Sequence, residues 1–180
     1  MLKKIVIIQA RLSSQRLPNK ILLPIGKNSS IGMVLSRLKT CKNIDDIIVA
    51  TTKQKMDDLL CQFCEQNQIK FFRGSTKDVL SRFYGAAKRF KAQVIVRVTS
   101  DTPLIDPNLI DEGLEIFSSG RYDYYSNVIK RTFPDGLDFE IFDFKTLELT
   151  HKYCKSSWGR EHVTVYMRTG SDLPTEKGNF

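Results

Sequence analysis

The sequence predicts an α/β protein with a mostly parallel central sheet between two layers of helices. Three short runs, residues 5–8, 47–52 and 94–99, are β-branched, apolar and nearly continuous. This pattern is typical of parallel strands that are buried on both faces. Segments with apolar side chains at helical spacing lie between these runs. Because strands and helices alternate, we expect right-handed crossovers and a doubly wound sheet.

Four amphipathic segments are expected to form the connecting helices, with apolar stripes in residues 31–38, 56–63, 79–90 and 109–117. The second stripe consists of Met56, Leu59, Leu60 and Phe63. Ser75 or Thr76 could cap the third helix, and Asp106, just before Pro107, fits the cap of the fourth. A shorter apolar run at residues 69–72 predicts a further strand.

The pattern changes after residue 120. Residues 122–127 and 136–142 both predict strands, and a turn at residues 134–136 precedes the second. Helical spacing returns at residues 143–154, whereas residues 161–167 are compatible with either a helix or a strand. We expect one domain over residues 1–167 and a polar tail over residues 168–180.

The basic residues are concentrated near the start of the chain. The protein has 180 residues and a formal net charge of +8, and residues 1–42 contain nine lysines and arginines but no acidic residue. Such a local basic field suggests a polyanionic partner, such as a nucleotide phosphate chain or nucleic acid. A solvated basic surface explains the charge equally well. No aromatic pattern of an RNA-binding domain is present, so a nucleic-acid partner is not expected.

Several classes of protein are not expected from the composition. No run approaches the roughly 18 apolar residues that a membrane helix needs. The short apolar run near the N-terminus is not followed by a small-residue cleavage site, so we expect no signal peptide. Four cysteines are too few for a disulfide scaffold in 180 residues. The expected location is therefore the cytoplasm.

The loop after the first predicted strand, residues 9–20 (QARLSSQRLPNK), is a candidate phosphate site. Ligands of open α/β sheets bind beyond the carboxyl ends of the strands, and this loop offers Arg11, Ser13, Arg16 and Lys20. It has neither the Walker A nor the GxGxxG pattern. The residues therefore suggest that guanidinium and ammonium groups bind a triphosphate, although a solvated basic loop is the alternative.

Asp101 follows the third predicted strand, at the same edge of the sheet. A carboxylate there could hold Mg²⁺, which prefers one or two carboxylates together with phosphate oxygens and waters. An Asx turn or a helix cap is the alternative. Asp78 and Arg82 are four residues apart on one helix face, so they could form a surface ion pair, or Arg82 could lie beside a base or a phosphate.

Two polar clusters occur late in the chain. The first consists of Asp135, Asp138 and Glu140, and the second of Arg160, Glu161 and His162. Solvated turns explain them as well as a site does. Cys61 and Cys64 lie within an amphipathic segment without a second pair, so we expect core thiols and no zinc site.

Five segments resemble a known family when they are taken together and in order. They are IIQARLSSQRLPNKILLPIG, RGSTKDVLSRFYGAAK, VRVTSDTPLID, RTFPDGLDFEIF and REHVT. They resemble the SpsF-like cytidylyltransferases of spore coat polysaccharide biosynthesis, which are related to acylneuraminate and 3-deoxy-manno-octulosonate cytidylyltransferases. The resemblance covers about residues 4–167. It implies a Rossmann-like, GT-A-type three-layer fold that activates a sugar, often a sugar acid, with CTP and Mg²⁺, giving a CMP-sugar and pyrophosphate for a cell-surface polysaccharide.

The resemblance also implies roles for individual residues. Arg11, Lys20 and Asp101 would be catalytic, with Asp101 as the metal ligand. The nucleotide would contact Gln9, Ala10, Arg11, Ser13, Arg16, Lys20, Thr51, Thr52, Arg82 and Asp101. The sugar would contact Asp135, Asp138, Glu140, Arg160, Glu161 and His162.

The chain departs from the family pattern at two places. Ser100 stands where relatives often have Gly. Relatives usually continue into a D-T-x-E-D-like segment with a second metal ligand, and nothing after Val163 resembles it. The alternative function is therefore a catalytically impaired protein that binds the nucleotide or the sugar. Relatives are often dimers, and the aromatic residues 122–125 could serve such an interface.

Overall fold

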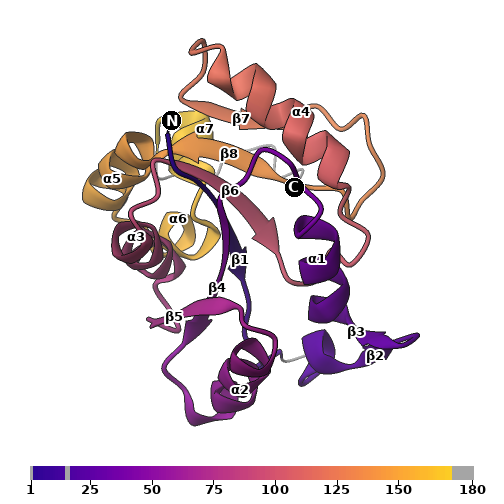
Figure 1. Cartoon of the computed structure of the whole chain (residues 1–180). Coiled ribbons are helices and arrows are strands. Elements are labelled where there is room, and N and C mark those ends of the chain that lie inside the picture. Colours follow the sequence, from indigo (N-terminus) through magenta and orange to yellow (C-terminus); the bar gives the residue numbers. More distant parts are fainter. Residues whose placement is uncertain (1, 15–16, 172–180) are drawn as a thin grey trace.

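A computed structural model describes residues 2–14 and 17–171, with a six-stranded sheet at its centre (Figure 1). The strand order is β5 (Lys70–Gly74), β4 (Asp46–Thr52), β1 (Lys4–Gln9), β6 (Val94–Thr99), β8 (Glu140–Asp143) and β7 (Tyr124–Ser126). The first four strands are parallel, whereas β8 is antiparallel to both of its neighbours. The predicted mostly parallel sheet is confirmed.

β1 lies between β4 and β6, and this position determines where the loops meet. Its last residue, Gln9, pairs with Ala50 of β4 and with Thr99 of β6. Because the three strands are parallel, the loops that follow them leave the sheet at one edge. The loop after β1 therefore has a neighbouring loop on each side.

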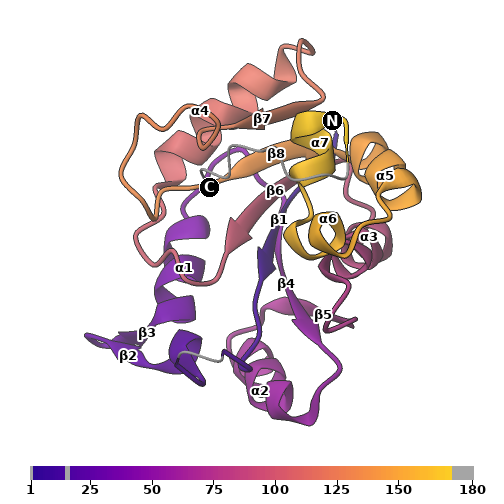
Figure 2. The same ribbon diagram turned by 180° about the vertical axis from the view of Figure 1, so that it is seen from behind.

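Helices cover both faces of the sheet (Figures 1 and 2). Val6 and Ile8 of β1 point to one face, which packs against α1 (Ser30–Leu38), α2 (Asp58–Gln66) and α4 (Pro107–Ser118). Ile5 and Ile7 point to the other face. That face packs against α3 (Val79–Phe90), α5 (Phe144–Tyr153) and the segment of α6 (Ser157–His162) and α7 (Val165–Thr169). The three-layer architecture follows from this alternation of apolar side chains.

Short elements complete the first βα connection. A 3-10 turn, η1 (Lys20–Leu22), is followed by the hairpin of β2 (Pro24–Ile25) and β3 (Asn28–Ser29), which projects beside the start of α1 (Figure 1). Ser29 caps α1 by accepting a hydrogen bond from the amide of Gly32 at 3.1 Å.

The helix caps only partly match the prediction. The Asp106 side chain accepts a hydrogen bond from the amide of Asn108 at 2.9 Å and caps α4, as predicted. Ser75 and Thr76 do not cap α3, because Asp78 takes that position and accepts from the amide of Ser81 at 2.8 Å.

The predicted apolar stripe of the second helix is partly confirmed. Leu60 is buried and Phe63 packs against the core, whereas Met56 and Leu59 are exposed and the other buried positions are Cys61 and Cys64. A 3-10 turn, η2 (Lys55–Asp57), precedes α2, so Met56 lies outside this helix. The expectation of core thiols is confirmed for both cysteines.

The later elements differ from the prediction in extent. β8 begins at Glu140 rather than at residue 136, and residues 161–167 are helical on either side of Val163. The predicted tail begins too early, since α7 continues to Thr169 and residues 172–180 lie outside the described part. No helix among the described residues is long and apolar enough to cross a membrane.

Gly113 in α4 allows this helix to lie close to β8. A Cβ at Gly113 would lie 2.6 Å from Cε2 of Phe139 and 3.1 Å from Cδ1 of Ile141, and both side chains are buried. Gly113→Ala should therefore lower the free energy of unfolding by about 1–2 kcal/mol, because overpacking outweighs the gain in helix propensity. Urea denaturation measures this change. Glu112→Ala, at an exposed position of the same helix, is the control, and a Gly113→Ala protein as stable as wild type would contradict the prediction.

Candidate active site

An ion pair joins the loops that follow β1 and β6. Nζ of Lys20 donates a hydrogen bond to Oδ2 of Asp101 at 2.6 Å. The two side chains are 32% and 50% exposed, so a ligand can reach both. The structure thus brings together the basic loop and the acidic residue that the sequence placed at the same edge.

Asp101 is held in its ionised form. Burial alone would raise the pKa of Asp101, but the hydrogen bond from Lys20, aided by one from Thr99, outweighs burial and lowers the pKa. Asp101 therefore offers a negatively charged oxygen at neutral pH, which is what a divalent cation requires.

Arg82 is buried beside the end of β5 rather than at the surface. Its side chain packs against Gly74, where a Cβ would lie 2.8 Å from Cγ of Arg82. Nη1 donates to the carbonyl of Ser75 at 2.6 Å, while Nε and Nη2 have no partner among the described residues. Burial, reinforced by the positive charge of Arg11, lowers the pKa of Arg82 to about 10.

The predicted surface pair of Asp78 and Arg82 does not form. Asp78 pairs instead with Arg160, whose Nη2 lies 2.8 Å from Oδ2 of the carboxylate. Arg160 also donates to the carbonyls of His151 and Cys154. The reason is that Asp78 caps α3 and faces α6, whereas Arg82 points under the neighbouring strand end.

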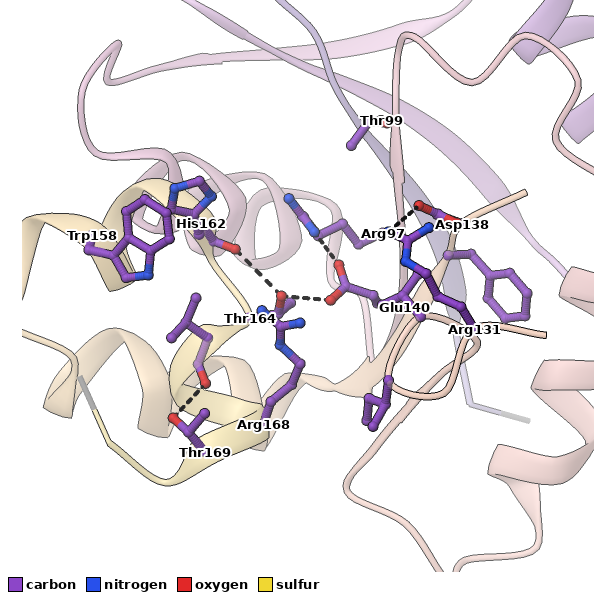
Figure 3. Close-up of a pocket in the computed structure, with 14 residues that line it drawn as sticks. Arg97, Thr99, Arg131, Asp138, Glu140, Trp158, His162, Thr164, Arg168 and Thr169 are labelled. Atoms are coloured by element: carbon purple, nitrogen blue, oxygen red, sulfur yellow. Dashed lines mark hydrogen bonds and ion pairs between the residues drawn. The ribbon is translucent and has the colours of Figure 1, made fainter. Parts of the chain in front are cut away.

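A cavity of about 440 Å³ adjoins this edge of the sheet (Figure 3). Its lining residues come from β6, β8, the segment before β8, α6 and α7. They are Arg97, Thr99, Val128, Ile129, Arg131, Asp138, Phe139, Glu140, Trp158, His162, Thr164, Val165, Arg168 and Thr169.

Two contacts connect the cavity to the edge of the sheet at which Lys20 and Asp101 form their ion pair. The Thr99 side chain lines the cavity and forms a hydrogen bond with Asp101. Nη2 of Arg97 donates to Oε1 of Gln9, the last residue of β1, at 3.3 Å. The cavity therefore adjoins the edge of the sheet at which the Lys20–Asp101 pair lies.

Glu140 organises the wall of the cavity that β6 and β8 form. It is 5% exposed, forms an ion pair with Arg97, and accepts a hydrogen bond from Thr164 at 2.6 Å (Figure 3). It also accepts one from the hydroxyl of Tyr124 at 2.6 Å. Burial alone would raise the pKa of Glu140, but the charge of Arg97 above all, with these hydrogen bonds, lowers it.

An aromatic pair and an arginine complete the lining. Trp158 lies against His162 with ring centroids 3.7 Å apart (Figure 3). Burial is the main cause that lowers the pKa of His162, so its ring is neutral at pH 7. Arg131 pairs with Asp135 and lies 3.6 Å from the carboxylate of Asp138.

The structure places the remaining predicted residues as follows. Arg11 is exposed, Ser13 is half-buried, and Ala10 is part of the core. Thr51 and Thr52 are fully buried, and Oγ1 of Thr51 has no partner among the described residues. Arg16 lies outside the described residues. Of the predicted sugar contacts, only Asp138, Glu140 and His162 line the cavity, whereas Asp135, Arg160 and Glu161 do not.

Some residues of the cavity, and Asp57 beside the basic loop, were not predicted from the sequence. Arg97, Thr99, Trp158, Thr164 and Arg168 line the cavity without having been predicted. Arg97 could have been predicted, because a cation within the buried run VIVRVT needs a partner. Asp57, which contacts the basic loop, could not have been predicted, since an acidic residue at a helix start is ordinary.

Comparison with known proteins places this geometry in a family. The cytidylyltransferase family model matches residues 5–173. The chain belongs to this family. The family consists of CTP-dependent nucleotidyltransferases. Membership confirms the resemblance to cytidylyltransferases that the five sequence segments show.

Individual relatives agree with the family assignment. The cytidylyltransferase is 44% identical to an uncharacterized protein of Methanocaldococcus jannaschii, over 96% of this chain and 70% of that protein. It is 34% identical to the spore coat polysaccharide biosynthesis protein SpsF of Bacillus subtilis, over 90% of this chain and 68% of SpsF. A 3-deoxy-manno-octulosonate cytidylyltransferase of Syntrophotalea carbinolica is 31% identical over 58% of this chain and 41% of its own length.

Solved structures confirm the fold. A cytidylyltransferase from Leptospira borgpetersenii superposes with a TM-score of 0.90 at 35% identity, over 98% of this chain and 77% of that one. CMP:2-keto-3-deoxy-manno-octonic acid synthetase in complex with CTP superposes with a TM-score of 0.70 at 15% identity, over 93% of this chain and 86% of that one. The Rossmann-like nucleotidyltransferase fold is therefore confirmed.

Glu140→Gln should destabilise the cytidylyltransferase by about 3 kcal/mol at pH 7, because it leaves Arg97 buried without its counter-charge. Since the folded-state pKa of Glu140 is lowered, its stabilisation is full above the ordinary glutamate pKa of about 4.3 and is lost as pH falls through the lower folded value. Urea denaturation between pH 3 and pH 7 should therefore show a smaller acid-dependent loss for the variant than for wild type.

Asp138→Asn is the control for this prediction, because Asp138 lines the same cavity but is 37% exposed. Equal unfolding midpoints of Glu140→Gln and wild type at pH 7 would contradict the role assigned to the Arg97–Glu140 pair.

Proposed function

We propose that this cytidylyltransferase transfers a cytidylyl group from CTP to a hydroxyl of a sugar acid, giving a CMP-sugar and pyrophosphate for cell-surface polysaccharide synthesis. The observation that carries the proposal is the Lys20–Asp101 pair at the edge of the sheet, next to the cavity that Thr99 shares. The similarity to a spore coat polysaccharide biosynthesis protein and to a 3-deoxy-manno-octulosonate cytidylyltransferase supports the class of substrate.

The basic loop supplies the nucleotide half of the proposed site. The sugar hydroxyl attacks the α-phosphorus of CTP, the bond to the bridging oxygen of the β-phosphate breaks, and pyrophosphate leaves. Arg11 and Lys20 would offset the charge that develops on the departing phosphates, and positioning contributes the rest. Arg82, two of whose buried nitrogens have no partner in residues 2–14 and 17–171, would bind the nucleotide.

The chemistry of Asp101 suits Mg²⁺. This ion takes one or two carboxylates and completes its coordination with phosphate oxygens and waters. Asp101 is accessible and ionised, and no group of three or more ligating side chains occurs in residues 2–14 and 17–171. We therefore expect Mg²⁺ to bind with the nucleotide, where it would supply positive charge at the α-phosphate.

The cavity supplies the acceptor half. Arg97, Arg131 and Arg168 line it together with Asp138 and Glu140, so its cations outnumber its carboxylates. An anionic sugar is thus favoured over a neutral one. The Trp158 ring offers an apolar face against which a sugar ring can pack.

The decisive measurement is pyrophosphate release by the full chain with CTP, Mg²⁺ and a panel of sugar acids. Asp101→Asn should lower turnover at least about 100-fold, because it removes the metal-binding charge. Asp106→Asn, in the same loop but at the α4 cap, should retain turnover. Unchanged turnover in Asp101→Asn would refute the metal role. CTP binding without pyrophosphate release by wild type would identify a nucleotide-binding protein instead.

Lys20 should compete with a divalent cation for Asp101 when no nucleotide is bound, because its ammonium lies at the carboxylate. Lys20→Met should raise the affinity of the nucleotide-free protein for Mn²⁺ about tenfold, since a nearby positive charge is removed. Titration of Mn²⁺ followed by electron paramagnetic resonance measures this. The same variant should bind CTP more weakly. No gain in Mn²⁺ affinity would exclude Asp101 as the metal ligand.

A further inference from the structure

Asp57 is a fully buried carboxylate that contacts the basic loop and the end of β4. It lies in η2, just before α2, and its side chain is inaccessible to solvent. Oδ1 accepts a hydrogen bond from the backbone amide of Leu12 at 2.7 Å, and Oδ2 accepts one from the hydroxyl of Thr52. One side chain therefore bridges two strand ends at the edge of the sheet.

A local structural role does not explain this burial. Asp57 occupies the N-cap position of α2, yet its side chain makes no capping hydrogen bond to that helix. An aspartate at a helix start normally uses its carboxylate for such a bond. Here both oxygens are turned away from α2, toward Leu12 and Thr52.

Leu12 is the residue through which this contact reaches the rest of the loop. Its carbonyl accepts hydrogen bonds from the amides of Ser14 at 2.8 Å and Asn19 at 3.1 Å. Asn19 directly precedes Lys20, which pairs with Asp101. Asp57 thus holds a residue to which both sides of the loop are hydrogen-bonded.

The charge of Asp57 also lies close enough to Arg82 to affect it, as does the charge of Arg11. Arg11 and the buried Arg82 repel each other, which is one reason why the pKa of Arg82 is lowered, and the charge of Asp57 acts in the opposite direction. No ion pair of Asp57 is present in residues 2–14 and 17–171, so its charge acts on Arg82 without a direct bond. A buried carboxylate is costly unless such partners compensate it.

We propose that Asp57 is a positioning residue for CTP, which holds the basic loop preformed for the triphosphate at a set distance from Thr52 and Arg82. The proposal rests on the nucleotide site described under the proposed function. It assigns Asp57 no contact with the substrate, because the side chain is wholly enclosed.

Asp57→Asn is the sharpest test because it preserves the shape and removes the charge and one acceptor. The Thr52 hydroxyl can rotate to accept from the new amide group, whereas the Leu12 amide can only donate. The variant should therefore fold and keep both contacts, but a neutral amide oxygen accepts from the Leu12 amide more weakly than a carboxylate does, so the loop is less firmly held. Asp58→Asn is the matched control, since Asp58 is the next residue and pairs with Arg73 away from the loop.

The affinities of CTP and CMP for the full chain, measured by calorimetry well below the melting temperature, separate positioning from stability. CMP lacks the β- and γ-phosphates, so the ratio of the CTP affinity to the CMP affinity measures how strongly the loop binds these two phosphates. Asp57→Asn should lower CTP affinity at least about tenfold and CMP affinity much less, whereas Asp58→Asn should leave both unchanged. Hydrogen–deuterium exchange should be faster at the Leu12 amide in Asp57→Asn.

An unchanged ratio of CTP to CMP affinity in a folded Asp57→Asn protein would overturn the proposal, even if its melting temperature fell. If this variant does not fold, Thr52→Val removes one of the two bridges, and the same ratio should fall about threefold; an unchanged ratio again overturns the proposal. Absence of CTP binding by wild type would refute the proposed function first, and the role of Asp57 with it.

Discussion

The parallel pairing of β1 with both β4 and β6 is the constraint on which the site depends. β1 ends level with β6, whereas β4 continues to Thr52, and the loop after β1 is reached from both sides. Asp57 contacts the loop from the β4 side, and Asp101 contacts it from the β6 side. The basic loop is thereby held between two carboxylates, and in the proposed function its cations face the phosphate chain of CTP.

Charge compensation differs between the two halves of the site. In the cavity, the buried cation Arg97 is matched by Glu140, which two hydroxyl groups also contact. At the edge, Arg82 retains two buried nitrogens without partners among the described residues. The buried cation of the cavity wall is thus compensated within the protein, whereas the described residues leave two nitrogens of Arg82 uncompensated.

Local sequence patterns sufficed for most of the strands and helices, because buried β-branched runs and apolar stripes express burial directly. They also placed Lys20 and Asp101 at one edge, since the ends of parallel strands coincide. They did not predict contacts that depend on packing. For Arg82 they allowed a surface pair with Asp78, whereas the side chain is buried, packed against Gly74. Asp57 reaches Leu12 across 45 positions of the chain, and no local pattern reports such a contact.

The two halves of the proposed site come from different parts of the chain, and this separation affects how the family can diversify. The nucleotide half comes from residues up to Asp101, whereas the cavity is lined mostly by residues after position 127, from the segment before β8 and from α6 and α7. The sheet meets this later part through the antiparallel β8, which needs no crossover helix. Under the proposed function, substitutions and insertions there would alter which acceptor is admitted without changing the residues that bind CTP. The same sheet would then serve different acceptors.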